Sequence, residues 1–549
     1  MSRKSKRKVW VVDAETDPFK HGRFPKPFIW GAYDGSQFLV FYDTKSFVEW
    51  MAEEHAFIYA HNGGKFDFMF LLPFIHEYMG ENEFKCKIIN GRIAEMPFGK
   101  AKMRDSWSII PTPLKDFQKD DFDYSKMEAD VRHKHMPEII RYLKSDCVNL
   151  YQIVDTFRLT AGKGLTIAGN ALSFARSLDI NVGRSNRRFD KKFRPFYYGG
   201  RCQALQPGIH QACDFFDIKS AYPFAMKENH ASGTEYIDRA EVFNRLSDDR
   251  LKNCFIVLTC DSEGAFPIKS RSDLSFPIGR GTFYVTGWEF VTAKKHNLIS
   301  GAQIHHCYEF YGEVSFADYV DHWFASKEEA EKAGDKPLRH VCKIMLNSLY
   351  GKLCQNPIRY MDYKFVPALT EPDVSEGWSL AAQGKDYEIH KKPSLHKLYE
   401  KYGEDWESFP VFYNVATGAS ITGFCRAMLL DAIHRAGREN SLYCDTDSLI
   451  LRSGAGNALD RGEYLGQWGW EGFAPRVYIA GRKQYGAKLS RGPKKGIKLA
   501  SKGANLNLSQ IKKLCKGATI RYEHDAPTFK LDGRAEFITR AIKATGVTQ

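Results

Sequence analysis

The sequence predicts a multidomain protein of mixed α/β and α+β type. At 549 residues the chain is long enough for several domains with substantial cores. Roughly the first 160 residues alternate apolar strands with helical stretches, which is typical of an α/β domain. A basic, aromatic connector marked by glycines follows at 197–201, and after it the pattern changes. These observations favour an α/β domain followed by a larger α+β part.

The first domain contains three clear elements. Residues 9–12 and 57–60 are short apolar runs typical of buried strands. A helix is expected from 137 to 150, because Pro137 is well placed in a first turn.

The second part begins with a strand at 215–217 that runs into a turn at 220–223. A helix rich in apolar residues is expected at about 338–352. The segment 356–410 is polar, aromatic and irregular in pattern, so we expect an insertion there.

Composition narrows the class of protein. The hydrophobic share of 43% and charged share of 26% are those of a soluble globular protein. The net charge of +13 points to a polyanionic partner, either nucleic acid or an anionic membrane. We expect no membrane attachment, because no apolar run approaches the ~20 residues of a spanning helix. The 12 cysteines lack zinc-ligand spacing, which favours a reducing, cytoplasmic compartment.

Two carboxylates lie at the turn of an apolar hairpin. Asp445 and Asp447 are framed by apolar residues at 442–444 and 449–451. An acidic pair in such a frame is costly unless a cation such as Mg²⁺ binds it. The alternative is a polar hairpin tip that is exposed to water.

A third carboxylate and a basic helix face belong to the same candidate site. Asp217 ends an apolar strand, where α/β proteins place ligands, although a helix N-cap is the alternative. The expected helix at 338–352 carries four polar residues at spacings of four, four and three: Arg339, Lys343, Asn347 and Tyr350. Such a face suits a triphosphate, and the alternative is a solvated basic surface.

The first domain carries a separate acidic group. Asp13 and Glu15 are two apart at a strand end and share one face. Tyr142 and Asp146 are four apart on one helix face, and Asp67 follows the second strand. The four carboxylates could enclose two Mg²⁺ ions ~3.5–4 Å apart, which would clamp a phosphodiester and its attacking water. Tyr142 would orient that water or the phosphate. Each motif alone is more often an ordinary surface or half-buried feature.

In this order the motifs resemble those of the family B DNA polymerases, over about residues 9 to 490. The resemblance rests on the exonuclease motifs (Asp13/Glu15, Asn62/Asp67, Tyr142/Asp146), on 217–223, on 343–351 and on 443–448. More narrowly, the chain resembles the protein-primed subgroup of phages and linear replicons. The motifs of that subgroup are Tyr197-x-Gly199-Gly200, Thr422 with Arg426, and Lys483-x-Tyr485.

The resemblance implies an RNase H-like 3′–5′ exonuclease domain joined to a right-hand polymerase of palm, fingers and thumb, with two insertions. The implied domains are the exonuclease domain (1–160), connector and first part of the palm (161–228), first insertion of the terminal-protein-contact type (229–320), fingers (321–355), second insertion of the strand-displacement type (356–410), second part of the palm (411–490) and thumb (491–549).

The resemblance also implies residue roles. Asp217 and Asp447 would hold the polymerase metals, with Asp445 assisting, and Tyr222 would exclude ribonucleotides. The implied nucleotide-binding residues are Tyr222, Arg339, Lys343, Asn347 and Tyr350. The implied DNA-binding residues are Asn62, Phe66, Ser106, Tyr197, Gly199, Gly200, Thr422, Arg426, Lys483 and Tyr485. Residues 482–502 add a footprint for DNA phosphates, with eight Lys or Arg and no acid.

The expected cofactor is Mg²⁺, two ions per active site, with Mn²⁺ as a substitute. The expected partners are template-primer DNA, dNTPs, a terminal protein as primer and a single-stranded-DNA-binding protein, and we expect a monomer in the host cytoplasm. One alternative is a family B polymerase that uses ordinary nucleic-acid primers. Another is a nuclease or nucleic-acid-binding scaffold with an inactive polymerase half. A protein of anionic membranes is a third, but the chain lacks an amphipathic anchor.

Overall fold

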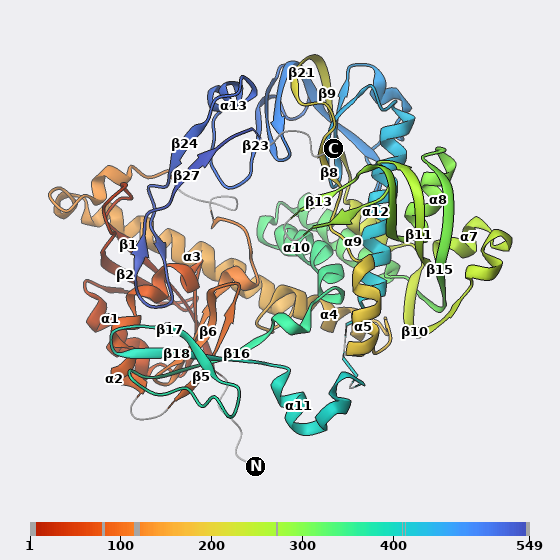
Figure 1. Cartoon of the computed structure of the whole chain (residues 1–549). Coiled ribbons are helices and arrows are strands. Elements are labelled where there is room, and N and C mark those ends of the chain that lie inside the picture. The colour runs from red at the N-terminus through yellow and green to blue at the C-terminus, as the bar shows by residue number, and fades with distance from the viewer. Residues whose placement is uncertain are drawn as a thin grey trace.

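The computed structural model describes residues 7–79, 83–114, 121–270, 273–408, 410–411 and 413–544. Figure 1 shows an N-terminal domain, a second large sheet with helices against it, and a C-terminal segment that arches from that sheet back to the N-terminal domain. None of the helices in these ranges has both the length and the hydropathy needed to cross a bilayer.

The N-terminal domain is built on a ten-stranded mixed sheet in the order β17-β18-β16-β5-β6-β7-β4-β1-β2-β3. Its N-terminal strands are β1 (Lys8–Thr16), β2 (Pro27–Tyr33), β3 (Phe38–Phe41), β4 (Ala56–Ala60), β5 (Phe84–Ile89), β6 (Arg92–Phe98) and β7 (Ala101–Asp105). Strand β4 runs parallel to β1 and to β7, as a βαβ pattern requires. The strands predicted at 9–12 and 57–60 are confirmed.

Helices cover both faces of this sheet because the side chains of β1 alternate. Val11 packs in one core with residues of α3 (Met136–Thr160). Trp10 and Val12 pack in a second core with residues of α1 (Thr44–Glu53). The helix predicted at 137–150 is therefore confirmed, and it continues to Thr160. The short α2 (Ile75–Met79) follows three 3-10 turns after β4.

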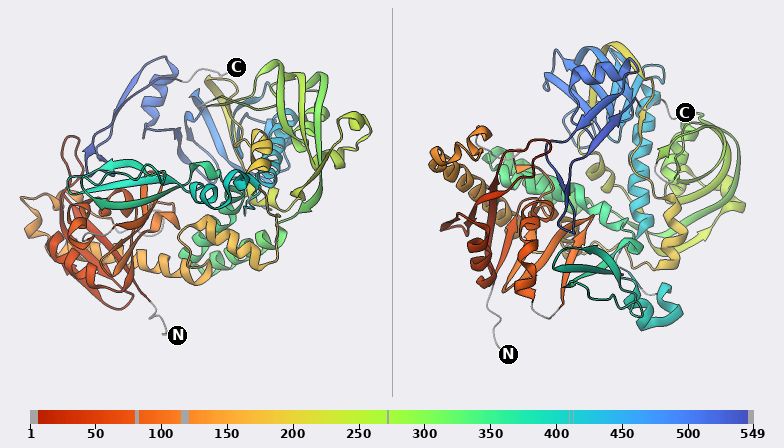
Figure 2. Two further views of the ribbon diagram at one scale, coloured as in Figure 1. Left: turned by 60° about the horizontal axis from the view of Figure 1, so that its bottom comes forward. Right: turned by 60° about the vertical axis from the view of Figure 1, so that its left-hand side comes forward.

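The segment 356–410, which was expected to be an insertion, contains regular strands and a helix. It forms β16 (Met361–Pro367), β17 (Ser379–Gln383), β18 (Tyr387–Pro393) and α11 (His396–Tyr402). Strand β16 pairs antiparallel with β5, so these strands extend the N-terminal sheet, as both views in Figure 2 show. The polar, aromatic pattern hid the strands because their packing partners, such as Phe84 beneath Phe365, lie far away in the sequence.

The second large sheet has the order β23-β22-β21-β9-β20-β19-β8. Its strands are β8 (Cys202–Ala204), β9 (Gly208–Ile218), β19 (Ser441–Asp445), β20 (Ser448–Arg452), β21 (Trp468–Gly481), β22 (Gln484–Leu489) and β23 (Gly496–Ser501). Helix α12 (Val415–Arg435) is buried along nearly its whole length, and α6 (Ala221–Met226) follows β9. The sheet continues through β23, so the palm boundary predicted at 490 lies within it.

The region predicted as the first insertion forms its own four-stranded sheet, β10-β15-β11-β14. It comprises β10 (His230–Asp238), α7 (Asp248–Lys252), β11 (Cys254–Glu263), β12 (Ile268–Lys269), β13 (Leu274–Ser275), β14 (Ile278–Thr286), α8 (Gly287–Lys295) and β15 (Ile299–Val314). The long helices α9 (Ala317–Ala333) and α10 (Lys336–Leu353) follow as a packed pair. Helix α10 confirms the helix predicted at 338–352. The connector contributes α4 (Ile167–Ser177) and α5 (Arg187–Phe193).

The C-terminal segment contains α13 (Leu508–Cys515), β24 (Ile520–Glu523), β25 (Thr528–Phe529), β26 (Ala535–Glu536) and β27 (Thr539–Ile542). Its tip lies against the N-terminal domain and the β16–β18 extension (Figure 1). The Phe529 ring meets Phe66 and Phe70 edge to face, and the Tyr387 hydroxyl donates to the Leu531 carbonyl at 2.8 Å.

Two candidate active sites

Three carboxylates meet at the end of β1. Asp13 and Glu15 project from one face of the strand, and Asp146 reaches them from α3. One oxygen of each lies within 4.8 Å of one oxygen of the other two, a spacing that a shared cation can bridge. The prediction that the strand and the helix bring these acids together is confirmed.

Asp67, the fourth expected carboxylate, is not within 4.8 Å of all three of these, but it is near enough for the charge of Asp13 to act on it. It begins a short 3-10 turn and is 2% exposed. Its Oδ1 has no hydrogen-bond partner among the described residues. Burial, followed by the charges of Asp13 and Asp105, raises the pKa of Asp67 well above its ordinary value. A buried carboxylate with an unsatisfied oxygen beside other acids is the chemistry that a hard cation satisfies, so the donor set fits Mg²⁺.

Tyr142 lies one helical turn before Asp146, as predicted. Its hydroxyl shares a 2.9 Å hydrogen bond with the Tyr124 hydroxyl, and Phe122 packs on its ring. Burial is the main cause that raises the pKa of Tyr142, and the bond to Tyr124 adds to it. The phenol therefore stays protonated and can donate a hydrogen bond.

The predicted DNA-binding residues beside this group differ in exposure. Asn62 is half-buried in a left-handed conformation, and Arg92 Nη1 donates to its Oδ1 at 2.8 Å. The same Arg92 nitrogen donates to buried Asp105 at 2.6 Å. Ser106 is fully buried and contacts His61 Nδ1 at 2.9 Å, so it positions the segment and does not face solvent. Sequence reasoning missed Arg92 and Asp105, because nothing local distinguishes them from other surface charges.

The second site lies at one end of three adjacent strands. Asp217 is near the end of β9, Asp445 ends β19, and Asp447 lies in the turn before β20. Ser448 pairs with both Asp217 and Asp445, and the Ile218 amide donates to the Asp447 carbonyl at 2.7 Å. The hairpin predicted around Asp445 and Asp447 is confirmed, and the sheet places Asp217 beside it.

Burial is the main influence on the pKa values of Asp217 and Asp447, and like charge adds to it at Asp447. Burial, then the charges of Asp217 and Asp445, raises the pKa of Asp447 to about 7. Burial also raises the pKa of Asp217. Lys483 Nζ lies 2.9 Å from Asp445 Oδ2 and offsets part of the negative charge. The oxygen donor set and its uncompensated charge fit divalent metal ions.

Two further residues of this site were missed from the sequence. Half-buried Lys498 on β23 forms an ion pair with buried Glu471 on β21, and Lys494 pairs with the same carboxylate. Burial lowers the pKa of Lys498, and the charges of Asp217 and Asp447 oppose that shift. The basic density of 482–502 was a signal for Lys498, but its strand pairing was not predictable from that density.

The predicted nucleotide-binding face is formed by α10. Arg339, Lys343 and Asn347 are exposed, and Tyr350 is half-buried. Tyr350 stacks on Tyr222 of α6 with ring centroids 4.1 Å apart and planes 8° from parallel. The structure therefore brings the tyrosine after β9 against the basic helix, as the predicted site requires.

The glycine motif of the connector touches the acidic turn directly. A Cβ atom on Gly200 would lie 2.6 Å from Thr446 Oγ1, whereas one on Gly199 would meet nothing within 4 Å. The Thr446 amide also donates to the Arg201 carbonyl at 2.6 Å. Gly200 is required because the connector passes against the Asp445–Asp447 turn.

Thr422 and Arg426 are both buried in this structure, and their DNA-binding role stays a prediction. Arg426 is 2% exposed, and it forms a two-pronged ion pair with Glu289 of α8 at 2.7 and 2.9 Å. It also donates to the carbonyls of Tyr198 and Gly199. Arg426 therefore holds the connector against α12. Tyr485 is also buried, with 8% of its surface exposed, and it packs on Tyr443 beneath the acidic turn.

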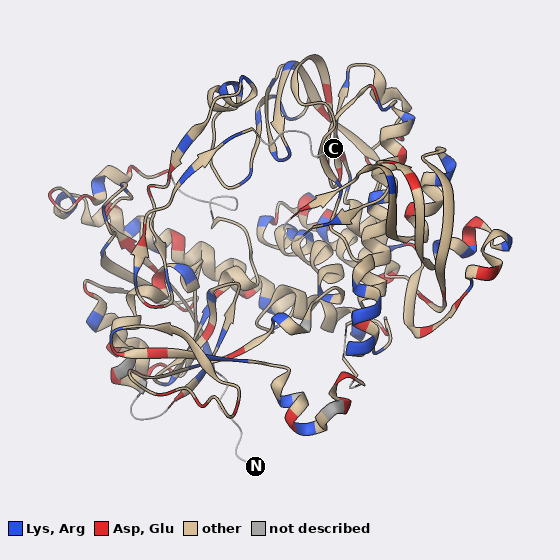
Figure 3. Cartoon of the chain, in the orientation of Figure 1, with Lys and Arg blue, Asp and Glu red and all other residues tan. Residues whose placement is uncertain are grey.

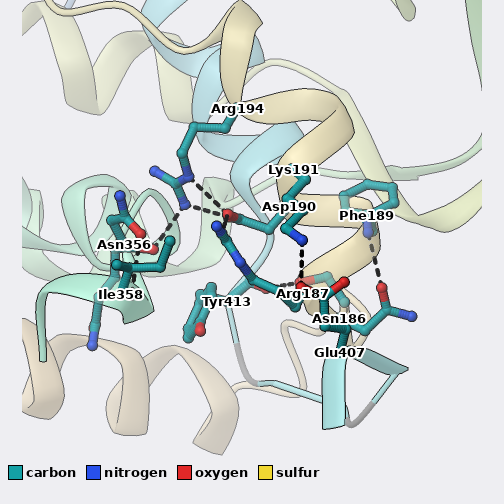
Figure 4. Close-up of polar contacts among 12 residues, drawn as sticks. Asn186, Arg187, Phe189, Asp190, Lys191, Arg194, Asn356, Ile358, Glu407 and Tyr413 are labelled. Carbon is teal, nitrogen blue, oxygen red and sulfur yellow. Dashed lines mark hydrogen bonds and ion pairs between the residues drawn. The ribbon is translucent and has the colours of Figure 1, made fainter. Parts of the chain in front are cut away.

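The connector helix α5 ties this region to the end of α10 (Figure 4). Asp190 is 1% exposed and accepts from Arg187 at 2.6 Å and from Arg194 Nε at 2.8 Å. Arg194 also donates to the carbonyls of Cys354 and Gln355 just beyond α10, where a cation suits the helix C-terminus. Tyr197 follows Arg194 by three residues and is half-buried.

Basic residues recur on several elements of the molecule. Figure 3 shows Lys and Arg along α5, α10 and the C-terminal strands. A cavity of about 1120 Å³ lies between α5, the β5–β6 turn, β14 and the segment after α10. Its lining includes Arg187, Lys191, Arg359, Tyr197 and Tyr360, a basic and aromatic composition that suits single-stranded nucleic acid.

This fold and these two acidic sites together define the class of DNA polymerases. Residues 117–401 match the family described as DNA polymerase type B, organellar and viral. The chain is 35% identical to the DNA-directed DNA polymerase of Enterobacteria phage PRD1, over 99% of this chain and 100% of the relative. It is 24% identical to the DNA polymerase of Bacillus phage Nf, over 74% of this chain and 73% of that one.

Solved structures confirm the predicted fold class. Phi29 DNA polymerase covers 98% of this chain and 100% of its own, with a TM-score of 0.73 at 18% identity. Phi29 DNA polymerase complexed with primer-template DNA and incoming nucleotide substrates gives a TM-score of 0.74 at 17% identity. The chain belongs to the family B DNA polymerases and is a DNA-directed DNA polymerase.

Proposed function

We propose that this polymerase combines two-metal nucleotidyl transfer at Asp217, Asp445 and Asp447 with a proofreading 3′–5′ exonuclease at Asp13, Glu15, Asp67 and Asp146. We further propose that it replicates a linear genome by protein-primed initiation and strand displacement. The observation that carries the two-site proposal is the pair of separate acidic groups, each with a carboxyl whose pKa burial and like charge raise.

For synthesis, Mg²⁺ ions bound by the palm carboxylates would lower the pKa of the primer 3′-OH and neutralise charge on the phosphates. Lys343 and Arg339 bind the triphosphate from the exposed face of α10. Tyr222, which stacks flat against Tyr350, crowds a 2′-OH in this proposal and so excludes ribonucleotides. Lys483 and Lys498 add positive charge beside the acids, where the primer terminus belongs.

For proofreading, Mg²⁺ ions held by the N-terminal carboxylates would activate a water for attack on the terminal phosphodiester. The protonated Tyr142 hydroxyl donates a hydrogen bond to that water or to the phosphate. Asn62 and Phe66 hold the single-stranded 3′ end. Their support comes from Arg92, which fixes the Asn62 amide, and from the aromatic packing around Phe66.

Two variants separate the sites. Asp447→Ala should abolish primer extension and leave Mg²⁺-dependent degradation of a single-stranded oligonucleotide intact. Asp13→Ala with Glu15→Ala should do the reverse. Loss of both activities from either variant, with the fold intact by circular dichroism, would sink the two-site proposal.

The protein-priming proposal rests on the motifs of the subgroup and on the segments 229–320 and 356–410, which we assign as its two insertions. Its partners are template-primer DNA, dNTPs and a terminal protein, with a single-stranded-DNA-binding protein as helper. The test incubates the purified chain with a candidate terminal protein of the same replicon, Mg²⁺ and a labelled dNTP. A protein band that acquires label, and loses it with Asp447→Ala, supports protein priming. Extension of an ordinary primer without such a band favours conventional priming.

A further inference from the structure

The loop between β1 and β2 places two exposed phenylalanines beside the N-terminal carboxylates. Phe19 is 48% exposed and Phe24 is 51% exposed. Exposed aromatic rings that adjoin further aromatic side chains can form a binding surface, so the neighbours of each ring decide its role. No role follows for this loop from the motifs described above.

The loop is held in a fixed shape. Glu128 binds Lys20 at 2.5 Å and Arg23 at 2.6 Å, and these partners lower its pKa to about 2. Arg132 pairs with Asp17 at 3.0 Å at the start of the loop. A backbone bond from the Asp17 amide to the Lys26 carbonyl closes the base. These ion pairs and this backbone bond hold the loop that carries Phe19 and Phe24.

The two rings have different neighbours. Phe24 packs on Phe537 of the C-terminal segment with centroids 5.3 Å apart, and His21 contacts the same ring. Phe24 thus has a docking role. Phe19 instead meets Phe66 edge to face at 5.7 Å, and this is its one ring contact within the described part of the chain.

Phe66 immediately precedes Asp67 and is enclosed by Phe19, Phe70 and Phe529. The aromatic surface therefore continues outward from the carboxylates through Phe66 to Phe19, whose ring stays half exposed. The neighbouring Lys65 is also exposed and supplies positive charge for a phosphate backbone. Exposed aromatic faces beside basic side chains are the usual platform for unpaired bases.

We propose that Phe19 is a base-stacking residue that extends the single-strand site of the N-terminal domain and grips the DNA 3′ end upstream of the scissile bond. The occupant is single-stranded DNA, because the flat faces of bases in a duplex are covered by neighbouring bases and cannot stack on Phe19. This inference rests on the proposed exonuclease function, and it deepens that function by adding a subsite.

The test measures binding of a 5′-labelled single-stranded oligonucleotide by fluorescence anisotropy in EDTA, where hydrolysis cannot occur. Phe19→Ala should weaken binding about tenfold, the usual loss for one stacked base. Phe19→Tyr should bind like the wild type. Phe24→Ala is the matched control, from the same loop with similar exposure, and should leave binding unchanged.

An abasic scan identifies the stacked base. We would use a set of oligonucleotides, each with one abasic site at a different position from the 3′ end. For the oligonucleotide that lacks the stacked base, wild type and Phe19→Ala should bind with equal affinity. In Mg²⁺, Phe19→Ala should raise KM for hydrolysis and leave kcat unchanged. Equal binding by wild type and Phe19→Ala, or the same loss on a fully abasic strand, would overturn the proposal.

The two proposals fail in distinguishable ways. If binding by the wild type depends on Phe19 as expected but the strand is not degraded in Mg²⁺, the exonuclease assignment is wrong. The base-stacking role of Phe19 is then still supported. If the strand is degraded without any dependence on Phe19, the platform alone is wrong.

Discussion

At the scale of single residues, four of the nine non-glycine residues with left-handed φ in the described part of the chain lie at the candidate sites. Asn62, Ser220, Thr446 and Lys483 are non-glycine residues with φ between 53° and 61°. Each lies within or next to a motif that carries a proposed catalytic or DNA-binding residue. Left-handed φ is costly for such residues, and it persists where the surrounding structure requires it, often at active sites. The acidic turn uses this geometry at Thr446 to aim Asp445 and Asp447.

The pKa of Asp447 predicts a pH-dependent stability. The folded pKa of about 7 exceeds the ordinary 3.8. This group therefore stabilises the fold fully only below about pH 4, and the contribution is lost as pH rises to 7. In EDTA, Asp447→Asn should increase the free energy of unfolding at pH 8 by roughly 2 kcal/mol more than at pH 5. Urea denaturation at both pH values measures this, and saturating Mg²⁺ should remove the advantage of the variant. An equal effect at both pH values would contradict the assigned cause.

Gly200 and Gly199 form a matched pair for testing the connector. Gly200→Ala places its Cβ 2.6 Å from Thr446 Oγ1 and must displace the acidic turn or the connector. We expect nucleotide incorporation to fall roughly 10- to 100-fold, since small displacements of catalytic groups cost that much. Gly199→Ala should keep near wild-type incorporation. Single-turnover extension kinetics decide the matter, and equal effects of the two variants would show that the contact with Thr446 is unimportant.

At the scale of elements, one ion pair joins three parts of the polymerase. Arg426 on α12 binds Glu289 on α8 and the connector carbonyls of Tyr198 and Gly199. Both side chains of the pair are 2% exposed. A buried pair of this kind costs desolvation, so its value lies in fixing the mutual arrangement of the elements.

Breaking this pair should be costly, and removing both charges should not be. Arg426→Met leaves Glu289 buried without its partner, and we expect a loss of about 3–5 kcal/mol in the free energy of unfolding. The double variant Arg426→Met with Glu289→Met should recover most of that loss. Denaturant titration of both variants tests this expectation. A stable single variant that only binds DNA more weakly would instead support direct contact of Arg426 with DNA.

At the scale of the whole molecule, the C-terminal segment closes back on the N-terminal domain. Phe529 meets Phe66 and Phe70, and Phe537 meets His21 and Phe24, so the tip touches both the aromatic surface and the β1–β2 loop. The proposed exonuclease and polymerase halves are thereby linked at several places. One is the connector, and a second is this contact between the chain's two ends. The pairing of β16 with β5 and the packing of α10 against α3 add further links.

Phe529→Ala should loosen the second link. The loss of two aromatic pairs, at about 1 kcal/mol each, should increase opening of the tip without unfolding the protein. We expect faster amide hydrogen exchange in residues 520–542 and shorter products per DNA-binding event at an unchanged extension rate. Phe529→Tyr, which keeps the ring, is the control. Unchanged exchange would show that the contact does not hold the segment in place.

Local patterns in the sequence determined much of this protein. Asp13 and Glu15 on one strand face, Tyr142 and Asp146 on one helix face, the Asp445–Asp447 hairpin and the basic face of α10 all follow from residue spacing. Such features depend on strand and helix periodicity, which the sequence alone displays. The order of the motifs was sufficient to indicate the polymerase family.

Only the tertiary structure decided which distant residues meet. It showed that 356–410 extends the N-terminal sheet, that Asp67 lies outside the three-carboxylate group, and that Arg426 is a buried partner of Glu289. It also placed Gly200 against Thr446 and Phe19 against Phe66. These outcomes depend on contacts between segments up to hundreds of residues apart, and their local sequences carry no periodic signal for such pairings. Residue spacing therefore determined which functional side chains each element carries. Three-dimensional packing decided which of these side chains meet in one site.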